Sequence, residues 1–130
     1  MRFARAVFIG AGVWGIVVLT PLYFLVDVAG RHYAPPASDP QFFYGFVSVT
    51  MAWQIAFLVI GSNPARFRPL MIAGIIEKLG YVATVAVLHA HGRISSADVA
   101  AAVPDAFLAA LFGIAFLKTA SSDPSVISRG

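Results

Sequence analysis

Four long apolar segments dominate the pattern of hydrophobic and polar positions along this chain. Each contains 19 to 21 residues, and they cover residues 6–26, 42–60, 70–90 and 97–117. At a rise of about 1.5 Å per residue, a helix of this length spans about 30 Å, which is the thickness of the hydrocarbon core of a bilayer. The pattern therefore predicts an all-α polytopic membrane protein, folded as an antiparallel bundle of four transmembrane helices.

Polar residues, glycine and proline mark where these helices begin and end. Asp39-Pro40 offers an N-cap acceptor followed by a proline at the first helical position, and the run 61–64 (Gly-Ser-Asn-Pro) ends the second helix. Residues 95–98 resemble a capping box with Asp98 in place of glutamate. Because a helix starting at Pro104 would be too short to cross, we expect the fourth helix to begin near Ser96 and to bend at Pro104.

The helical part is expected to form one domain, residues 1–118, followed by a mobile cytoplasmic tail, residues 119–130. A cleaved signal peptide ending near residues 28–30 is an alternative for the first segment. Its apolar stretch is longer than the hydrophobic region of most signal peptides, so an uncleaved anchor is favoured.

The basic residues are distributed unequally over the predicted loops. One side would carry six of them and the other side two, Arg31 and Arg93; the six are Arg2, Arg5, Arg66, Arg68, Lys118 and Arg129. Because loops rich in lysine and arginine stay in the cytoplasm, both termini are predicted to be cytoplasmic, in a bacterial inner membrane. This asymmetry also accounts for the net charge of +3, and no nucleic-acid-binding motif surrounds these residues, so no nucleic acid is expected as a partner.

The composition agrees with a membrane protein and excludes several other classes. Hydrophobic residues make up 59% of the chain and charged residues 12%, and the mean hydropathy is +0.83. Soluble domains are about 45–50% apolar and about 25% charged. The absence of cysteine excludes thiol redox chemistry and thiolate metal sites. A soluble enzyme domain and a secreted disulfide scaffold are therefore excluded.

Several polar residues fall inside the predicted membrane spans. On the third helix Glu77, Tyr81 and Thr84 share one face with Gly74, and on the second helix Ser48 and Gln54 share a face with Tyr44 and Met51. A short hairpin joins these two helices, so we expect the two polar faces to lie against each other. Glu77 and Gln54 would lie at nearly the same depth, about 10 Å from the cytoplasmic boundary.

Asp105 on the fourth helix would be the second carboxyl group in the bundle interior. Because a charged side chain at mid-bilayer costs about 2.5–3.5 kcal/mol on insertion scales, we expect Glu77 to be protonated or paired. Lys78 is a possible counter-ion. It points about 100° away from Glu77 around the helix, so extension toward the cytoplasmic headgroups is the favoured interpretation.

Two interpretations of this polar cluster remain open. Glu77, Gln54, Tyr81, Asp105, Thr84 and Ser48 either form a network that fixes the helix register or line a site for a proton, an ion or a small lipophilic ligand. No catalytic residue is assigned. We also expect no metal and no cofactor, because the spacing of His32, His89 and His91 matches no zinc pattern.

The order of these features resembles the DoxX-like group of small bacterial four-helix membrane proteins of unknown function. The segments that carry the resemblance are residues 43–46 (Phe-Tyr-Gly-Phe), 65–70 (Ala-Arg-Phe-Arg-Pro-Leu) and Glu77-Lys78. Some members of that group are associated with thiol or redox stress, but direct thiol chemistry needs a cysteine, which this chain lacks. The resemblance thus implies a fold and not a reaction.

The favoured function is that of an accessory protein which binds a small lipophilic ligand or a partner within the bilayer. A membrane isomerase or reductase acting on a lipid or quinone-like substrate, with Glu77 and Asp105 as acid and base, is an alternative, as is a small proton-coupled transporter. Small residues at four-residue spacing on the first helix, Ala6 with Gly10 and Ala11 with Gly15, additionally suggest a homodimer.

Overall fold

The computed structural model describes residues 2–24 and 40–120, and within these two ranges it contains helices and turns but no strand. Its elements are α1 (Arg2–Leu19), the 3₁₀-helix η1 (Thr20–Tyr23), α3 (Pro40–Ser62), α4 (Arg68–Ala90), α5 (Ser96–Ala101) and α6 (Val103–Ala120). Four stretches are long and apolar enough to cross a membrane: α1 with η1, α3, α4, and α5 with α6. The all-helical architecture predicted from the sequence is confirmed.

The helix ends follow the local signals in the sequence. The Ser95 side chain accepts a hydrogen bond from the Asp98 backbone N–H, and the Asp98 carboxylate accepts one from the Ser95 backbone N–H, which completes the expected capping box. The fourth helix is interrupted at Ala102, two residues before Pro104, because proline has no N–H to continue the ladder. Asp39, the predicted cap of α3, lies outside the described residues.

The predicted start of the C-terminal tail is too early. Thr119 and Ala120 belong to the last turn of α6, where the Thr119 hydroxyl is buried and donates a hydrogen bond to the carbonyl of Ala115. Residues 121–130, the remainder of the predicted tail, lie outside the described residues.

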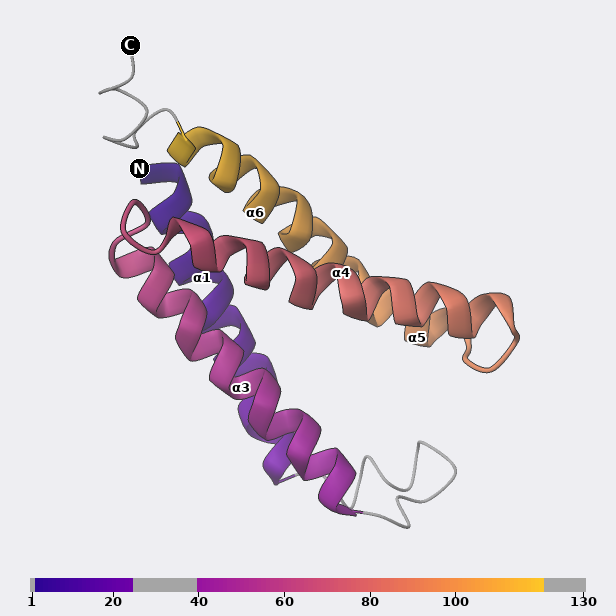
Figure 1. Ribbon diagram of the computed structural model, residues 1–130. Coiled ribbons are helices and arrows are strands. Elements are labelled where there is room, and N and C mark those ends of the chain that lie inside the picture. The colour runs from indigo at the N-terminus through magenta and orange to yellow at the C-terminus, as the bar shows by residue number, and fades with distance from the viewer. Residues whose placement is uncertain (1, 25–39, 121–130) are drawn as a thin grey trace.

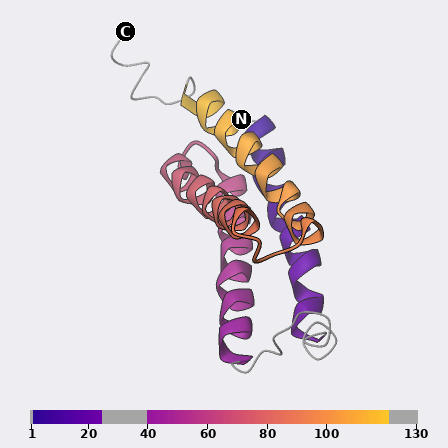
Figure 2. The same cartoon turned by 90° about the vertical axis from the view of Figure 1, so that its right-hand side faces the viewer.

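The helices are arranged as two pairs that form a wedge. In Figure 1, α1 and α3 run side by side in opposite directions, and α4 runs along α5 and α6 in the same manner. The pairs meet where α1 begins, α6 ends and the turn 63–67 joins α3 to α4, and they diverge toward the other end, as the turned view in Figure 2 also shows. Because α3 and α4 separate beyond their shared turn, the arrangement is more open than a closed bundle.

A cluster of aromatic rings holds the two pairs together at the closed end of the wedge. Phe112 of α6 stacks on Phe8 of α1 with 4.3 Å between ring centroids, and its edge contacts Phe57 of α3 at 4.9 Å. All three rings are fully buried, as is Met71 of α4. Each of the four long helical stretches thus contributes to one core, from which the pairs diverge.

Glycines allow α1 and α3 to approach closely. A Cβ atom on Gly12 would lie 2.8 Å from the backbone oxygen of Gln54, and one on Gly15 would overlap the Gln54 side chain. Ala11 is buried in the core cluster, whereas Gly10, on another face of α1, has no atom within 4 Å of its Cβ position. The Ala11–Gly15 pair therefore packs within the chain, and Ala6 and Gly10 remain exposed.

Candidate functional site

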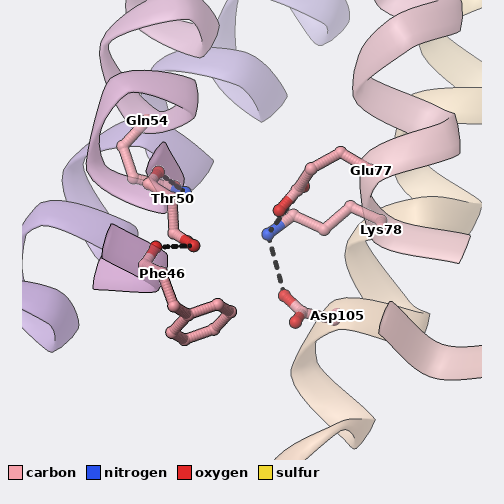
Figure 3. A network of polar contacts seen from close by, with 6 residues as sticks. All are labelled: Phe46, Thr50, Gln54, Glu77, Lys78 and Asp105. Carbon is pink, nitrogen blue, oxygen red and sulfur yellow. Dashed lines mark hydrogen bonds and ion pairs between the residues drawn. The ribbon is translucent and has the colours of Figure 1, made fainter. Parts of the chain in front are cut away.

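A buried lysine lies at the centre of the polar residues between the two helix pairs. Lys78 of α4 is only 4% exposed, and its Nζ donates a hydrogen bond of 2.8 Å to Oδ1 of Asp105 on α6. The same Nζ lies 3.6 Å from Oε2 of Glu77 and 5.4 Å from the centroid of the Phe57 ring. Figure 3 shows Lys78 between the two carboxylates. One ammonium group thus bridges both acidic residues of the interior.

The expectation that Lys78 extends to the cytoplasmic headgroups is wrong. The Lys78 side chain points about 100° around the helix from Glu77, toward the side of α4 against which α6 packs. Asp105 in the first turn of α6 binds the Lys78 ammonium there. A charge-assisted hydrogen bond to the partly buried Asp105 carboxylate replaces the solvation that the headgroups would have given. The sequence did contain a signal for this ion pair, because one lysine and one aspartate lie inside apolar spans, where an unpaired charge is unfavourable.

The Oε2 oxygen of Glu77 is ion-paired with Lys78 but makes no hydrogen bond within the described ranges. The Glu77 side chain is 19% exposed, and among the described residues Oε2 is buried without a hydrogen-bond partner, although Lys78 Nζ lies 3.6 Å away. A buried carboxylate oxygen normally accepts a hydrogen bond or carries a proton, because leaving it unpaired costs free energy. The Glu77 carboxyl group, whose side chain is partly exposed, can therefore hold a proton or pair with a further group.

Gln54 is buried as predicted but faces a different helix. It is 2% exposed, its Nε2 donates a 3.0 Å hydrogen bond to the carbonyl of Thr50 on its own helix, and its side chain fills the space beside Gly15 of α1. Figure 3 shows Gln54 and Thr50 on α3, apart from the ion pairs on α4 and α6. Gln54 thus closes the α1–α3 contact and does not join the carboxylates directly.

The two predicted polar faces do not lie against each other. Ser48 Oγ is 2.9 Å from the hydroxyl of Tyr23, so this part of the α3 face also turns toward α1 and η1. Thr84 donates its hydroxyl hydrogen to the carbonyl of Gly80 within α4. The expectation failed because the glycines of α1 accommodate this face of α3 closely, which turns a different face of α3 toward α4.

Two cavities occupy the wedge. The larger, about 590 Å³, lies between α3 and α4, and the smaller, about 290 Å³, reaches from α1 to α6. Both are bordered by Glu77, Tyr81, Phe46 and Thr50, so the two spaces meet beside these four side chains. Of the predicted site residues, Glu77, Tyr81 and Thr84 line the larger cavity, Gln54 and Asp105 line the smaller, and Ser48 lines neither.

The walls of the larger cavity are mostly apolar and aromatic. Besides Glu77 and Tyr81 it is bordered by Phe42, Phe46 and Trp53, all from α3. Such a surface, with few polar groups, is typical of sites for small lipophilic molecules, and about 300–1,000 Å³ is the usual volume of these sites. In the described ranges, no group of three histidine or acidic side chains is placed to hold a metal ion.

Comparison with protein-family models, curated proteins and solved structures gives no match for this chain. A function for this protein therefore has to be inferred from the geometry of the wedge.

Proposed function

We propose that this protein resides in a bacterial inner membrane and binds a small lipophilic molecule in the wedge between its helix pairs. The four apolar helical stretches support membrane insertion. Large apolar side chains also cover the outward surface, where Val17 is 63%, Ile76 64% and Leu117 71% exposed. An apolar surface of this extent is unfavourable in water and suits contact with acyl chains.

The basic residues support an orientation with the closed end of the wedge at the cytoplasmic face. Arg2 and Arg5 lie at the start of α1, Arg66 in the turn 63–67 and Arg68 at the start of α4, and all of these are at the closed end. Lys118 joins them, with its Nζ 4.4 Å from the Phe3 ring centroid. Under the positive-inside rule both termini are then cytoplasmic, and the wedge opens toward the outer half of the bilayer.

The observation that carries the proposed function is the position of the Glu77 side chain, which borders both cavities with apolar walls. A lipophilic molecule entering sideways from the bilayer would bury its apolar part against Phe46 and Trp53. Its polar group would then lie beside the Glu77 carboxylate. The role is thus binding, and the protein is an accessory or carrier protein for a ligand of the membrane.

The same geometry disfavours the enzyme alternative. An acid–base pair needs two groups that can each exchange a proton with the substrate. Lys78 lies close to both carboxylates, 2.8 Å from Oδ1 of Asp105 and 3.6 Å from Oε2 of Glu77, and it binds Asp105 the more tightly. The contacts support a single binding group more than a pair of catalytic ones.

Filling the larger cavity tests the proposal. Gly80 lines this cavity and has no atom within 4 Å of its Cβ position, so a side chain can be attached there, and the ring of Gly80→Phe is expected to occupy the space. Gly113 of α6 is equally open but does not border either cavity, which makes Gly113→Phe the matched control. The probe is 1-N-phenylnaphthylamine, a neutral lipophilic fluorophore that accepts excitation energy from tryptophan, and Trp53 borders the cavity.

In nanodiscs, we expect saturable energy transfer to the probe in the wild type and in Gly113→Phe. Gly80→Phe is expected to keep only the non-saturable background of probe dissolved in lipid. Equal saturable transfer in all three proteins, or none in the wild type, would refute a binding site in the wedge.

A further inference from the structure

The charged groups that face the wedge do not balance. Glu77 and Asp105 contribute two carboxylates, and Lys78 contributes one ammonium group. From α3 and α1, the residues that border the smaller cavity at this level are uncharged and include Gln54 and Trp14. Tyr81 of α4, the remaining titratable side chain there, is neutral in its ordinary form. Among the described residues, the site thus has one negative charge in excess when all three charged groups are ionised.

The excess charge is located on Glu77. Lys78 Nζ lies 2.8 Å from Asp105 and 3.6 Å from Glu77, so its shorter, hydrogen-bonded contact neutralises Asp105 first. An unbalanced charge within a membrane span is unfavourable, and the balancing group is either a proton or a cation. The Glu77 side chain borders both cavities, so either one can approach the Glu77 carboxylate there.

The larger cavity beside the Glu77 side chain is suited to a cation with an apolar body. Phe46, Trp53 and Tyr81 border the larger cavity together with Glu77. Aromatic faces attract cations, and this attraction is strongest where water is excluded. An anion would meet two carboxylates, while the one nearby ammonium is already engaged by Asp105. A neutral molecule would leave the charge of Glu77 unbalanced.

We propose that the ligand of the wedge is a lipophilic monovalent cation, an amphiphilic amine or an onium ion, which binds beside Glu77 in exchange for one proton. The proton leaves the Glu77 carboxyl group for bulk water as the cation takes its place, so the charge of the site is the same before and after. This inference rests on the proposed function and adds the chemical class of the ligand.

Three probes of similar size and different charge test the class of ligand on the wild-type protein. Tetraphenylphosphonium is a cation, triphenylphosphine oxide is neutral and tetraphenylborate is an anion. Each of the three probes is titrated into nanodiscs that hold the full chain, and its displacement of 1-N-phenylnaphthylamine is measured. The affinity is calculated from the concentration of the titrated probe in the bilayer. Equilibrium dialysis with empty nanodiscs gives that concentration. We expect the cation to bind about tenfold or more tightly than the neutral probe, and the anion to bind more weakly than either.

Removing the charge of Glu77 tests where the cation binds. Glu77→Gln is expected to lower the affinity for tetraphenylphosphonium about tenfold and to leave the affinity for triphenylphosphine oxide unchanged within about twofold. Asp98→Asn removes the same charge from the first turn of α5, away from both cavities, and is expected to change neither. Circular dichroism verifies that both variants remain helical.

Lowering the pH tests the exchange with a proton. Protons compete for the Glu77 carboxylate, so the affinity for tetraphenylphosphonium is expected to fall between pH 8 and pH 5 in the wild type and to stay constant in Glu77→Gln. In weakly buffered solution at the acidic end of this range, binding is expected to release protons from the wild type and none from Glu77→Gln.

The outcomes separate this inference from the proposed function. Saturable binding of 1-N-phenylnaphthylamine together with equal affinities for the cationic and neutral probes, or an unchanged cation affinity in Glu77→Gln, would overturn the cation proposal and leave the binding site standing. Tighter binding of tetraphenylborate than of tetraphenylphosphonium would also overturn the cation proposal. It would indicate that the positive charge of Lys78 dominates the site. Absence of saturable binding for every probe would overturn both.

Discussion

Replacing Lys78 by methionine is the perturbation with the most direct physical consequence. Methionine keeps an unbranched apolar side chain beside the Phe57 ring and removes only the ammonium group. The carboxylates of Asp105 and Glu77 then lose the positive charge that lies 2.8 Å and 3.6 Å from them. Removing one partner of a buried ion pair costs about 3–5 kcal/mol, because the other charge stays buried without compensation.

The partial exposure of the two carboxylates places the expected loss of unfolding free energy at the lower end of that range. The side chain of Lys78 is 5% exposed, but those of Asp105 and Glu77 are 26% and 19% exposed, so water can solvate them in part. We therefore expect Lys78→Met to lower the free energy of unfolding by about 3 kcal/mol. Neutralising the unpaired carboxylate in Lys78→Met/Asp105→Asn is expected to restore about 2 kcal/mol of this loss.

The assay is reversible unfolding of the purified protein in mixed micelles with increasing sodium dodecyl sulfate, followed by circular dichroism. Lys118, the other lysine of the chain, is exposed in the last turn of α6, and Lys118→Met is expected to cost less than about 1 kcal/mol. A Lys78→Met variant as stable as Lys118→Met, or a double variant no more stable than Lys78→Met, would refute the interpretation of Lys78 as the buried counter-ion.

Two further predictions concern the packing that shapes the wedge, and the same unfolding assay measures both. Gly12→Ala is expected to lower the free energy of unfolding by about 2 kcal/mol, because its Cβ would lie 2.8 Å from the Gln54 backbone oxygen. Gly10→Ala, whose Cβ has no atom within 4 Å, is expected to be neutral or stabilising. Similar values for both variants would contradict this account of the α1–α3 contact. Phe112→Ala is expected to lower the free energy of unfolding by about 3 kcal/mol through loss of its ring contacts with Phe8 and Phe57. Phe107→Ala, at a position 64% exposed on the same helix, is expected to lower it much less. Equal losses would show that the ring cluster does not join the two helix pairs.

The positions of the helices could be predicted from the sequence because local signals determine them. An apolar run of about 20 residues is helical wherever water is scarce, since only a helix satisfies its backbone hydrogen bonds within one segment. The capping box at Ser95 and Asp98 and the break before Pro104 depend on neighbouring residues alone. The burial of Gln54 and the presence of Glu77 and Asp105 in the interior followed from the same positional pattern.

The partners of the polar side chains depended on how each helix is rotated and tilted against its neighbours. Gly12 and Gly15 bring α1 so close to α3 that Gln54 and Ser48 face α1, and Phe46 and Trp53 face the wedge in their place. Lys78 is a paired residue of the interior because α6 lies on its side of α4. The sequence by itself therefore determined which residues are helical and which are polar within an apolar span. The tertiary structure alone decided which of them meet, because a rotation of about 100° about a helix axis exchanges one neighbour for another without changing any local preference.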